Sequence, residues 1–372
     1  MKEASGGKTL YLHVGMHKTG TTALQKFFSL NDRLLASHGI CYPELGRSAS
    51  LLAHHDIANS LKGPPFPLRA PEKSPEEYLE GIRDCFRTFP GVLLSSEIFM
   101  RFVPAFRDRL ELDLSQLEKL AAVADRVQVI IYLRRQDRYL ESFYSQEIQH
   151  DLCLDFSEFV AARMPDYYQI CQELAGFAGR DNVTVRVYDR NRFAGGTLYS
   201  DFLSALDIEQ TDSFVLPGED INPSLAPDER EFKRLVNALG LPIREVIRFN
   251  APLLQLSQAR RGAGETGAAL FSASQRTKLL ADCSEANRRL AADFLGRDSP
   301  GDTLFPAAAD DKRAAEAVYA GPDTVRLRGI AQALGQLAPE LVKLLSRAAR
   351  QALLSADHRA RDSAAILLAA LG

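Results

Sequence analysis

Four short stretches of the chain are rich in β-branched and other apolar residues, as buried strands are. They are Thr9–Val14, Val92–Ser96, Val127–Leu133 and Val183–Tyr188. The run Val127–Leu133 is almost continuously apolar, which predicts a central strand buried on both faces. Sequence with a helical pattern separates the stretches, so the strands should pair in parallel with helices on both sides. The pattern predicts an α/β fold with a parallel sheet flanked by helices.

The segment after the first strand has apolar residues at helical spacing, and a threonine can begin this helix at Thr21 or Thr22. The apolar positions are Ala23, Leu24, Phe27, Phe28, Leu34 and Leu35. Three later segments are dense in proline, glycine or arginine and predict loops. They are Gly63–Pro75, Leu216–Pro227 and the basic, flexible segment Arg260–Gly267.

The composition beyond Asp310 shifts to alanine, leucine and arginine. Apolar residues there alternate steps of four and three, which is typical of packed helices, and Pro339 is expected to open a new helix. The apolar positions are Ile330, Leu334, Leu337, Leu341 and Leu344. We therefore predict an α/β domain over residues 1–309 and a C-terminal α-helical extension over 310–372. The extension either packs on the core or forms a homodimer through these helices.

Composition excludes several classes of protein. Of the 372 residues, 46% are hydrophobic and 25% are charged, so the chain can bury a large core and is neither fibrous nor wholly disordered. The net charge of −3 argues against a general nucleic-acid coat or a polybasic membrane binder. No apolar run approaches the roughly 20 residues of a membrane helix, and the N-terminus lacks the pattern of a secretory signal. Five scattered cysteines and seven histidines form no disulfide or metal-binding pattern, so we expect a cytoplasmic protein without a metal.

The stretch Gly15–Thr22 follows a predicted strand and opens a predicted helix. A glycine-containing turn at such a position wraps an anion with backbone N–H groups, and the helix dipole favours the negative charge. Lys18 adds a positive charge and the threonines add hydroxyl donors. In a Walker A loop the lysine follows the second glycine directly, whereas here Thr21 follows Gly20. This order disfavours an ordinary ATPase or GTPase.

The loop resembles that of the sulfotransferases, which use 3′-phosphoadenosine 5′-phosphosulfate (PAPS) as donor. Their 5′-phosphosulfate loop has the core K-[ST]-G-T-T, matched by Lys18-Thr19-Gly20-Thr21-Thr22, and the wording HVGMHKTGTTALQ looks especially like bacterial members. The resemblance implies the sulfotransferase fold, an α/β fold with a P-loop-like parallel sheet flanked by helices, and donor binding by these five residues. His17 stands where the family often has proline and should orient the loop or contact the donor. Ala23 replaces the tryptophan of cytosolic vertebrate members, so the adenine contact must differ.

A second family signature is an arginine at the end of a later strand and a serine eight residues on, both binding the 3′-phosphate. Arg134 and Ser142 stand in this relation after Val127–Leu133, although Gln136 replaces the usual proline. A residue at a strand end and one two turns into the next helix can converge on one phosphate, and arginine donates two hydrogen bonds to it.

Two weaker matches complete the implied donor site. Val183–Arg192 resembles the strand whose tyrosine contacts adenine, which points to Tyr188 or to a structural tyrosine. Arg260-Arg261-Gly262 resembles a basic loop that closes over the 3′-phosphate, which points to Arg261.

Sulfuryl transfer needs a base for the acceptor hydroxyl and a cation for the leaving oxygen. Lys18 is the natural cation. Glu97 follows the second predicted strand, where the family places its base, and several carbohydrate sulfotransferases use glutamate there. Glu97 could also cap the next helix or pair with an arginine. His54 and His55, with Asp56, are the other candidates, and no metal is required.

We therefore expect a sulfotransferase that moves a sulfuryl group from PAPS to a hydroxyl on a carbohydrate, glycolipid or other metabolite, leaving 3′-phosphoadenosine 5′-phosphate. Two alternatives remain open at this point. One is a P-loop kinase-like phosphotransferase that uses the same loop for ATP. The other is a non-catalytic nucleotide-binding scaffold with the helical extension as its working part.

Overall fold

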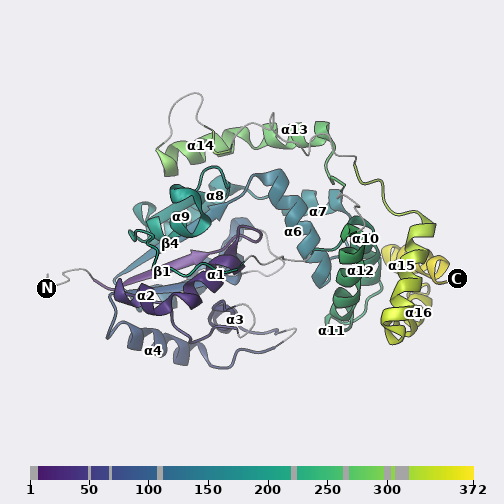
Figure 1. The fold of residues 1–372 in the computed structure, drawn as a ribbon, viewed down its shortest axis with the longest axis horizontal. Coiled ribbons are helices and arrows are strands. Elements are labelled where there is room, and N and C mark those ends of the chain that lie inside the picture. Colours follow the sequence, from purple (N-terminus) through teal and green to yellow (C-terminus); the bar gives the residue numbers. More distant parts are fainter. Residues whose placement is uncertain are drawn as a thin grey trace. The chain divides into compact units, whose positions relative to one another are not determined.

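The structure is a computed structural model that describes residues 7–48, 52–66, 69–106, 112–218, 224–262, 268–296, 303–305 and 318–372. Its centre is a five-stranded sheet in which every neighbouring pair is parallel (Figure 1). The strand order is β2-β3-β1-β4-β5. The strands are β1 (Thr9–Val14), β2 (Ile40–Cys41), β3 (Gly91–Ser96), β4 (Arg126–Leu133) and β5 (Val183–Val187). The four strands predicted from the sequence are present, and the parallel α/β arrangement is confirmed.

The chain divides into two compact units. The sheet unit comprises residues 1–139, 163–220 and 279–307, and the helical unit comprises 140–162, 221–278 and 308–372. The chain enters the helical unit for the last time at residue 308, close to the predicted boundary at 309. Two earlier segments also belong to the helical unit, so the units interleave along the sequence.

Helices flank the sheet within the sheet unit (Figure 1). Phe27 and Phe28 of α1 pack with Tyr132 of β4 and Phe202 of α9 in one fully buried aromatic cluster. Helix α8 packs against β4 and β5. The helices of this unit are α1 (Thr21–Leu30), α2 (Asp32–Ser37), α3 (His55–Lys62), α4 (Pro75–Cys85), α5 (Glu118–Ala121), α8 (Tyr167–Ala178), α9 (Leu198–Ser204) and α14 (Ser284–Leu295).

The helix predicted after β1 begins at Thr21 as expected but is broken at Asn31. The buried Asn31 amide donates to the carbonyl oxygens of Phe27 and Val215, and its own oxygen accepts the Val215 N–H, each at 2.8 Å. These tertiary bonds satisfy the end of α1 and redirect the chain into α2, which helical periodicity alone does not encode.

The predicted loops are only partly confirmed. The described residues of 63–75 form the connection between α3 and α4, and Ser74 closes it as the N-cap of α4 in a capping box with Glu77. The loop before α10 ends where Pro227 opens the helix, with 219–223 outside the described residues. The third loop is partly wrong, because Arg260 and Arg261 belong to helix α12. Residues 263–267 of that segment lie outside the described residues.

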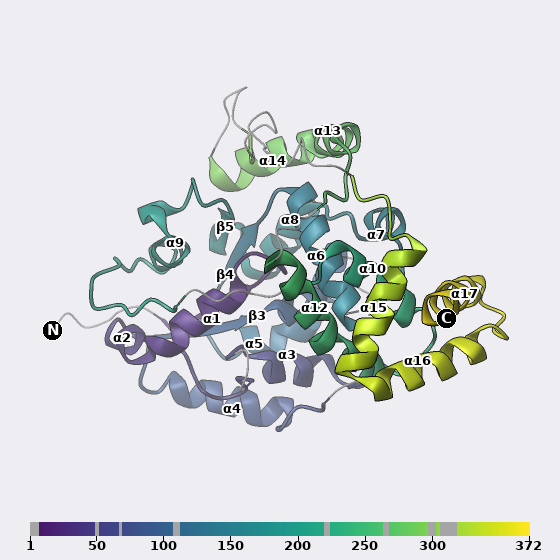
Figure 2. The ribbon, with the colours of Figure 1, turned by 45° about the vertical axis from the view of Figure 1, so that its right-hand side comes forward.

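The helical unit contains the rest of α6, which begins in the sheet unit, and a C-terminal group of three mutually packed helices (Figure 2). Pro339 is the first residue of α16, as predicted. Ile330, Leu334 and Leu341 are buried, whereas Leu337 is 41% exposed. The helices are α6 (Gln136–His150), α7 (Phe156–Arg163), α10 (Pro227–Asn237), α11 (Ile243–Val246), α12 (Asn250–Gly262), α13 (Ala273–Asp282), α15 (Thr324–Leu337), α16 (Pro339–Ala352) and α17 (His358–Leu371).

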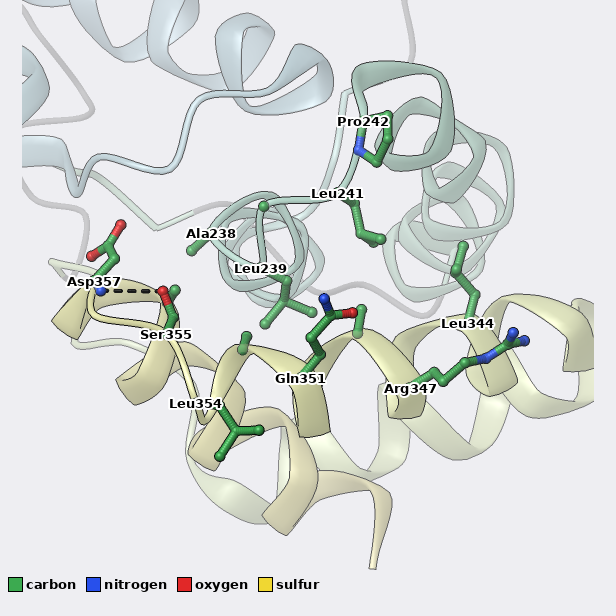
Figure 3. Close-up of a pocket in the computed structure, with 14 residues that line it drawn as sticks. Ala238, Leu239, Leu241, Pro242, Leu344, Arg347, Gln351, Leu354, Ser355 and Asp357 are labelled. Carbon is green, nitrogen blue, oxygen red and sulfur yellow. Dashed lines mark hydrogen bonds between the residues drawn. The ribbon is translucent and has the colours of Figure 1, made fainter.

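A cavity of about 800 Å³ lies in the helical unit between the segment after α10 and the turn from α16 to α17 (Figure 3). Leu239, Leu241 and Leu344 give it a largely apolar lining, to which Arg347 and Asp357 add charge. Within the described part of the chain, no helix has both the length and the apolar composition needed to cross a membrane.

Replacing Asn31 with alanine should lower the free energy of unfolding by about 1–2 kcal/mol, because the carbonyl and N–H of Val215 lose their side-chain partner and the Phe27 carbonyl loses one of its two donors. Urea denaturation measures this change. Ser37→Ala is the matched control, since that exposed hydroxyl donates only to Leu34 of the preceding turn, and its effect should stay within about 0.5 kcal/mol. An equal effect of both substitutions would contradict the role given to Asn31.

Candidate functional site

The carboxyl ends of four strands place three of the predicted site residues, and the glycine that opens the loop, along one edge of the sheet. In the parallel register Val14 pairs with Ser96, and Leu133 pairs with Val187. The residue after each of these strand ends is Gly15, Glu97, Arg134 or Tyr188. Because open α/β sheets bind ligands beyond the carboxyl ends of their strands, this edge is the candidate site.

The loop between β1 and α1 has the backbone of an anion-binding turn. Lys18 and Gly20 both adopt left-handed conformations, with φ of 66° and 79°. Gly20 is required twice over, because a Cβ there would also lie 2.5 Å from Leu198 Cδ2 and 2.9 Å from Tyr188 Cε2. The Thr19 hydroxyl donates to the Met16 carbonyl at 2.6 Å and holds the turn together. The first turn of α1 carries no acidic residue, so its N–H groups and dipole favour an anion.

Two cations meet at this loop. Arg134 Nη1 donates to the Lys18 carbonyl oxygen at 3.1 Å, and the Arg134 guanidinium carbon lies 5.8 Å from the centre of the Tyr188 ring. The Tyr167 hydroxyl donates to the Arg134 carbonyl at 2.7 Å and fixes the backbone at the end of β4. Burial and the nearby Arg134 charge both lower the pKa of Lys18. A bound phosphate would offset both effects.

Glu97 follows the end of β3 and is hydrogen-bonded to α1. Its Oε1 accepts the Thr21 hydroxyl, and its Oε2 accepts Gln25 Nε2 at 3.2 Å. The side chain is 13% exposed. Burial raises the pKa of Glu97, but the charges of His55 and His17 and the Thr21 hydrogen bond outweigh it, so the pKa lies below its usual value. The carboxylate is therefore ionised and able to accept a proton.

Gly15 makes this contact between β3 and α1 sterically feasible. A Cβ at position 15 would lie 2.3 Å from Thr21 Cγ2 and 3.2 Å from Glu97 Cγ. Any side chain there would push the helix start away from the carboxylate. The glycine that opens the loop is thus needed for close approach.

The two neighbouring histidines have different surroundings. His54 is fully buried, with Nε2 donating to the Pro43 carbonyl at 3.0 Å and Nδ1 accepting the Ser95 N–H at 3.1 Å. With both ring nitrogens bound to backbone, His54 braces the end of β3 instead of facing a substrate. His55 Nδ1 lies 2.7 Å from Ser96 Oγ, and its Nε2 is 3.9 Å from Glu97 Oε2. His55 therefore belongs to the site.

His17 lies in the loop with its ring centre 6.3 Å from that of Phe106, close enough for its charge to lower the pKa of Glu97. Thr22 lies half-exposed in the first turn of α1. Two predicted site residues belong to the helical unit. Ser142 is half-buried on α6, and Arg261 is exposed on α12, where it donates to the carbonyl oxygen and hydroxyl of Ser224.

Sequence reasoning missed the polar network beneath Glu97. Gln25 Nε2 also lies 3.3 Å from Ser95 Oγ, which is 2.8 Å from His13 Nδ1. Gln25 stands four residues after Thr21, so both lie on one face of α1, and that spacing was the available signal. His13 occupies the middle of an apolar strand, and its sequence position gave no hint of this role.

Comparisons with known proteins leave the family open. No protein-family model matches the chain, and no solved structure matches it. A protein of Archaeoglobus fulgidus described as uncharacterized is 30% identical over 169 residues, covering 45% of this chain. The matched part spans 46% of that protein, so less than half of its length is covered.

Acidification should destabilise the sheet unit through its buried histidines. Burial lowers the pKa of His13 to about 4 and that of His54 to about 3. Below pH 6.5 the unfolded chain therefore binds more protons than the folded protein, and the free energy of unfolding should fall as the pH drops from 6.5 towards 4. Each histidine contributes a slope of up to about 1.4 kcal/mol per pH unit.

Urea titrations between pH 4.5 and 7 measure this slope. His13→Asn should reduce the slope by the amount that corresponds to up to one bound proton. The exposed control His358→Asn should leave the slope unchanged. An unchanged slope in His13→Asn would show that this imidazole is protonated alike in both states.

Proposed function

We propose that the chain is a PAPS-dependent sulfotransferase that transfers a sulfuryl group to a hydroxyl acceptor. The observation that carries the proposal is the meeting of three groups at one sheet edge. The left-handed loop around Lys18 and the guanidinium of Arg134 touch each other, and the carboxylate of Glu97 binds the helix that the loop opens. Anion-binding backbone, paired cations and one ionised base are the parts that sulfuryl transfer requires.

In this proposal the loop holds the 5′-phosphosulfate of the donor. Backbone N–H groups from Lys18 to Thr22 and the α1 dipole would surround its oxygens, with the hydroxyl of Thr22 at the same end of the helix. Arg134 would bind the 3′-phosphate through its planar fork, supported by Tyr167 at the end of β4. Tyr188, which packs beside Gly20 and under Arg134, would border the adenine.

Glu97 would take the proton from the acceptor hydroxyl as that oxygen attacks sulfur. The new oxygen–sulfur bond forms while the bond from sulfur to the bridging phosphate oxygen breaks, and Lys18 stabilises the charge that develops on the phosphate. Thr21 and Gln25 would orient the carboxylate, beside which His55 Nε2 lies at 3.9 Å. A base and a charge clamp of this kind supply about 10²- to 10⁴-fold each.

The acceptor in this proposal is a hydroxyl on a carbohydrate, glycolipid or other metabolite. Chemistry without a metal is expected, because the donor is already activated. A cytoplasmic location and a homodimer through the C-terminal helices also remain predictions. The competing kinase-like and scaffold functions make different predictions for nucleotide binding and turnover.

Calorimetric titration of the full chain tests the donor site. We expect micromolar binding of 3′-phosphoadenosine 5′-phosphate and much weaker binding of adenosine 5′-phosphate or ATP with magnesium. Arg134→Ala should weaken binding of the 3′-phosphorylated ligand by about 10- to 100-fold, while changing the affinity for adenosine 5′-phosphate little. Arg126→Ala is the matched control, since this exposed arginine begins the same strand at the opposite edge of the sheet.

Equal losses for both ligands would mean that Arg134 does not read the 3′-phosphate. Binding of ATP with magnesium alone would overturn the sulfotransferase proposal in favour of the kinase-like function. Binding of the 3′-phosphorylated nucleotide without any turnover of PAPS would favour the scaffold.

Glu97→Gln should cut turnover of labelled PAPS by about 100-fold or more, because the amide cannot accept the proton. Donor affinity should stay near that of the unchanged protein, since the amide can still meet Thr21 and Gln25. Glu173→Gln is the control: its carboxylate accepts the Ala105 N–H at 2.8 Å and has no part in the proposed reaction. Full activity of Glu97→Gln would move the base to a histidine, and His55 is the one adjoining Glu97.

A further inference from the structure

Helix α10 of the helical unit is buried although its sequence is strongly polar. Eight of its eleven residues are buried, and five of these have charged or amide side chains. The buried residues are Asp228, Glu229, Arg230, Phe232, Lys233, Leu235, Val236 and Asn237. Charged side chains are almost never fully buried unless they are paired, so each requires a partner.

Three of the four buried charges of α10 have clear partners. Asp228 accepts from Arg260 at 3.0 Å and Arg326 at 3.2 Å, and Glu229 lies 3.0 Å from Arg260 Nε. The Lys233 ammonium donates to the carbonyl oxygens of Ile148 and His150, both at 3.1 Å, and to the Asn237 amide oxygen. These contacts anchor the carboxyl end of α6.

Arg230 is the exception. The residue is only 8% exposed. Its guanidinium carbon lies 5.9 Å from the centre of the Tyr144 ring and 5.7 Å from the centre of the Tyr319 ring. Nη1 reaches Ser145 Oγ at 3.4 Å, a long contact, and the buried Nη2 has no hydrogen-bond partner. Within the described part of the chain no carboxylate pairs with Arg230. Burial lowers the pKa of Arg230 and outweighs the opposing effect of the nearby Glu231 and Glu141 charges.

We propose that Arg230 anchors a binding site for an oxyanion in the helical unit, with Ser145 and the two tyrosines around it. The ligand group is a sulfate, phosphate or carboxylate, whose paired oxygens match the guanidinium fork. An anion there would supply the missing countercharge and the partner of Nη2. Ser145 and Tyr319, which both contact the Arg230 guanidinium, are half-buried. This site is independent of the proposed sulfotransferase function.

Thermal unfolding of the full chain tests the site with inorganic anions as probes. The background carries Lys18→Ala and Arg134→Ala, so that the loop of the sheet unit does not contribute. Sulfate, phosphate and acetate are each exchanged for chloride at constant ionic strength. At least one of these anions should raise the melting temperature saturably, by about 2 °C or more. The anion that does so identifies the chemical class of the ligand.

Arg230→Met should abolish the saturable rise. In chloride its melting temperature should equal or exceed that of the background protein, because an uncompensated buried charge has been removed. Arg234→Met is the matched control on the same helix, since Arg234 is already paired with Glu231 and the anion response should persist. If Arg230→Met does not fold, Ser145→Ala serves instead. It should leave the melting temperature in chloride unchanged and weaken binding of the anion several-fold.

Three results would overturn the proposal. The first is that no anion gives a saturable rise in melting temperature. The second is that the rise persists in Arg230→Met or is unchanged in Ser145→Ala. The third is that Arg230→Met alone, with the loop intact, weakens binding of 3′-phosphoadenosine 5′-phosphate as much as Arg134→Ala does. The last result would assign Arg230 to the donor site. Loss of donor binding with the anion response intact would instead overturn only the proposed function.

Discussion

The carboxylate of Glu97 joins the end of β3 to the beginning of α1, and the geometry of the candidate site depends on that link. One oxygen accepts the Thr21 hydroxyl and the other accepts the Gln25 amide one turn later. The two bonds fix both the position of the helix start and the direction of the carboxylate. Gly15 permits the approach, because even a methyl group at this position would collide with Thr21. The loop between β1 and α1 and the Glu97 carboxylate are thereby held together by direct contacts.

Local charge, and not the net charge of the chain, determines what this edge of the sheet can bind. The protein as a whole carries −3, yet Lys18 and Arg134 lie together at the loop. Their mutual repulsion and burial make the deprotonated state of Lys18 easier to reach, so an incoming dianion would restore the charged form. Burial raises the pKa of Glu97, but its interactions with His55, His17 and the Thr21 hydroxyl together bring that pKa below its usual value.

The longer strands of the sheet unit could be predicted from the sequence, because β1, β3, β4 and β5 each contain enough apolar residues to indicate a buried strand. Strand β2 was missed because two residues, Ile40 and Cys41, contain no readable alternation. Candidate residues that directly follow strands were predictable, since parallel register brings strand ends to one edge. The different surroundings of the adjacent His54 and His55 could not be predicted from the sequence. Successive residues at a helix start point in different directions, and only tertiary contacts decide which of them is enclosed by backbone.

Helix α10 marks the limit of sequence reasoning more sharply. A segment as polar as Pro227–Asn237 reads as a surface helix with one apolar stripe, yet the fold encloses most of it. Burial of this kind is affordable only when every charge finds a partner supplied by distant segments, and such pairings leave no local pattern. Asp228, Glu229 and Lys233 pair with groups of other segments, whereas no carboxylate among the described residues pairs with Arg230. In the sheet unit, Lys18 likewise has no carboxylate partner among the described residues. A buried cation without a carboxylate partner favours an anionic ligand on electrostatic grounds alone.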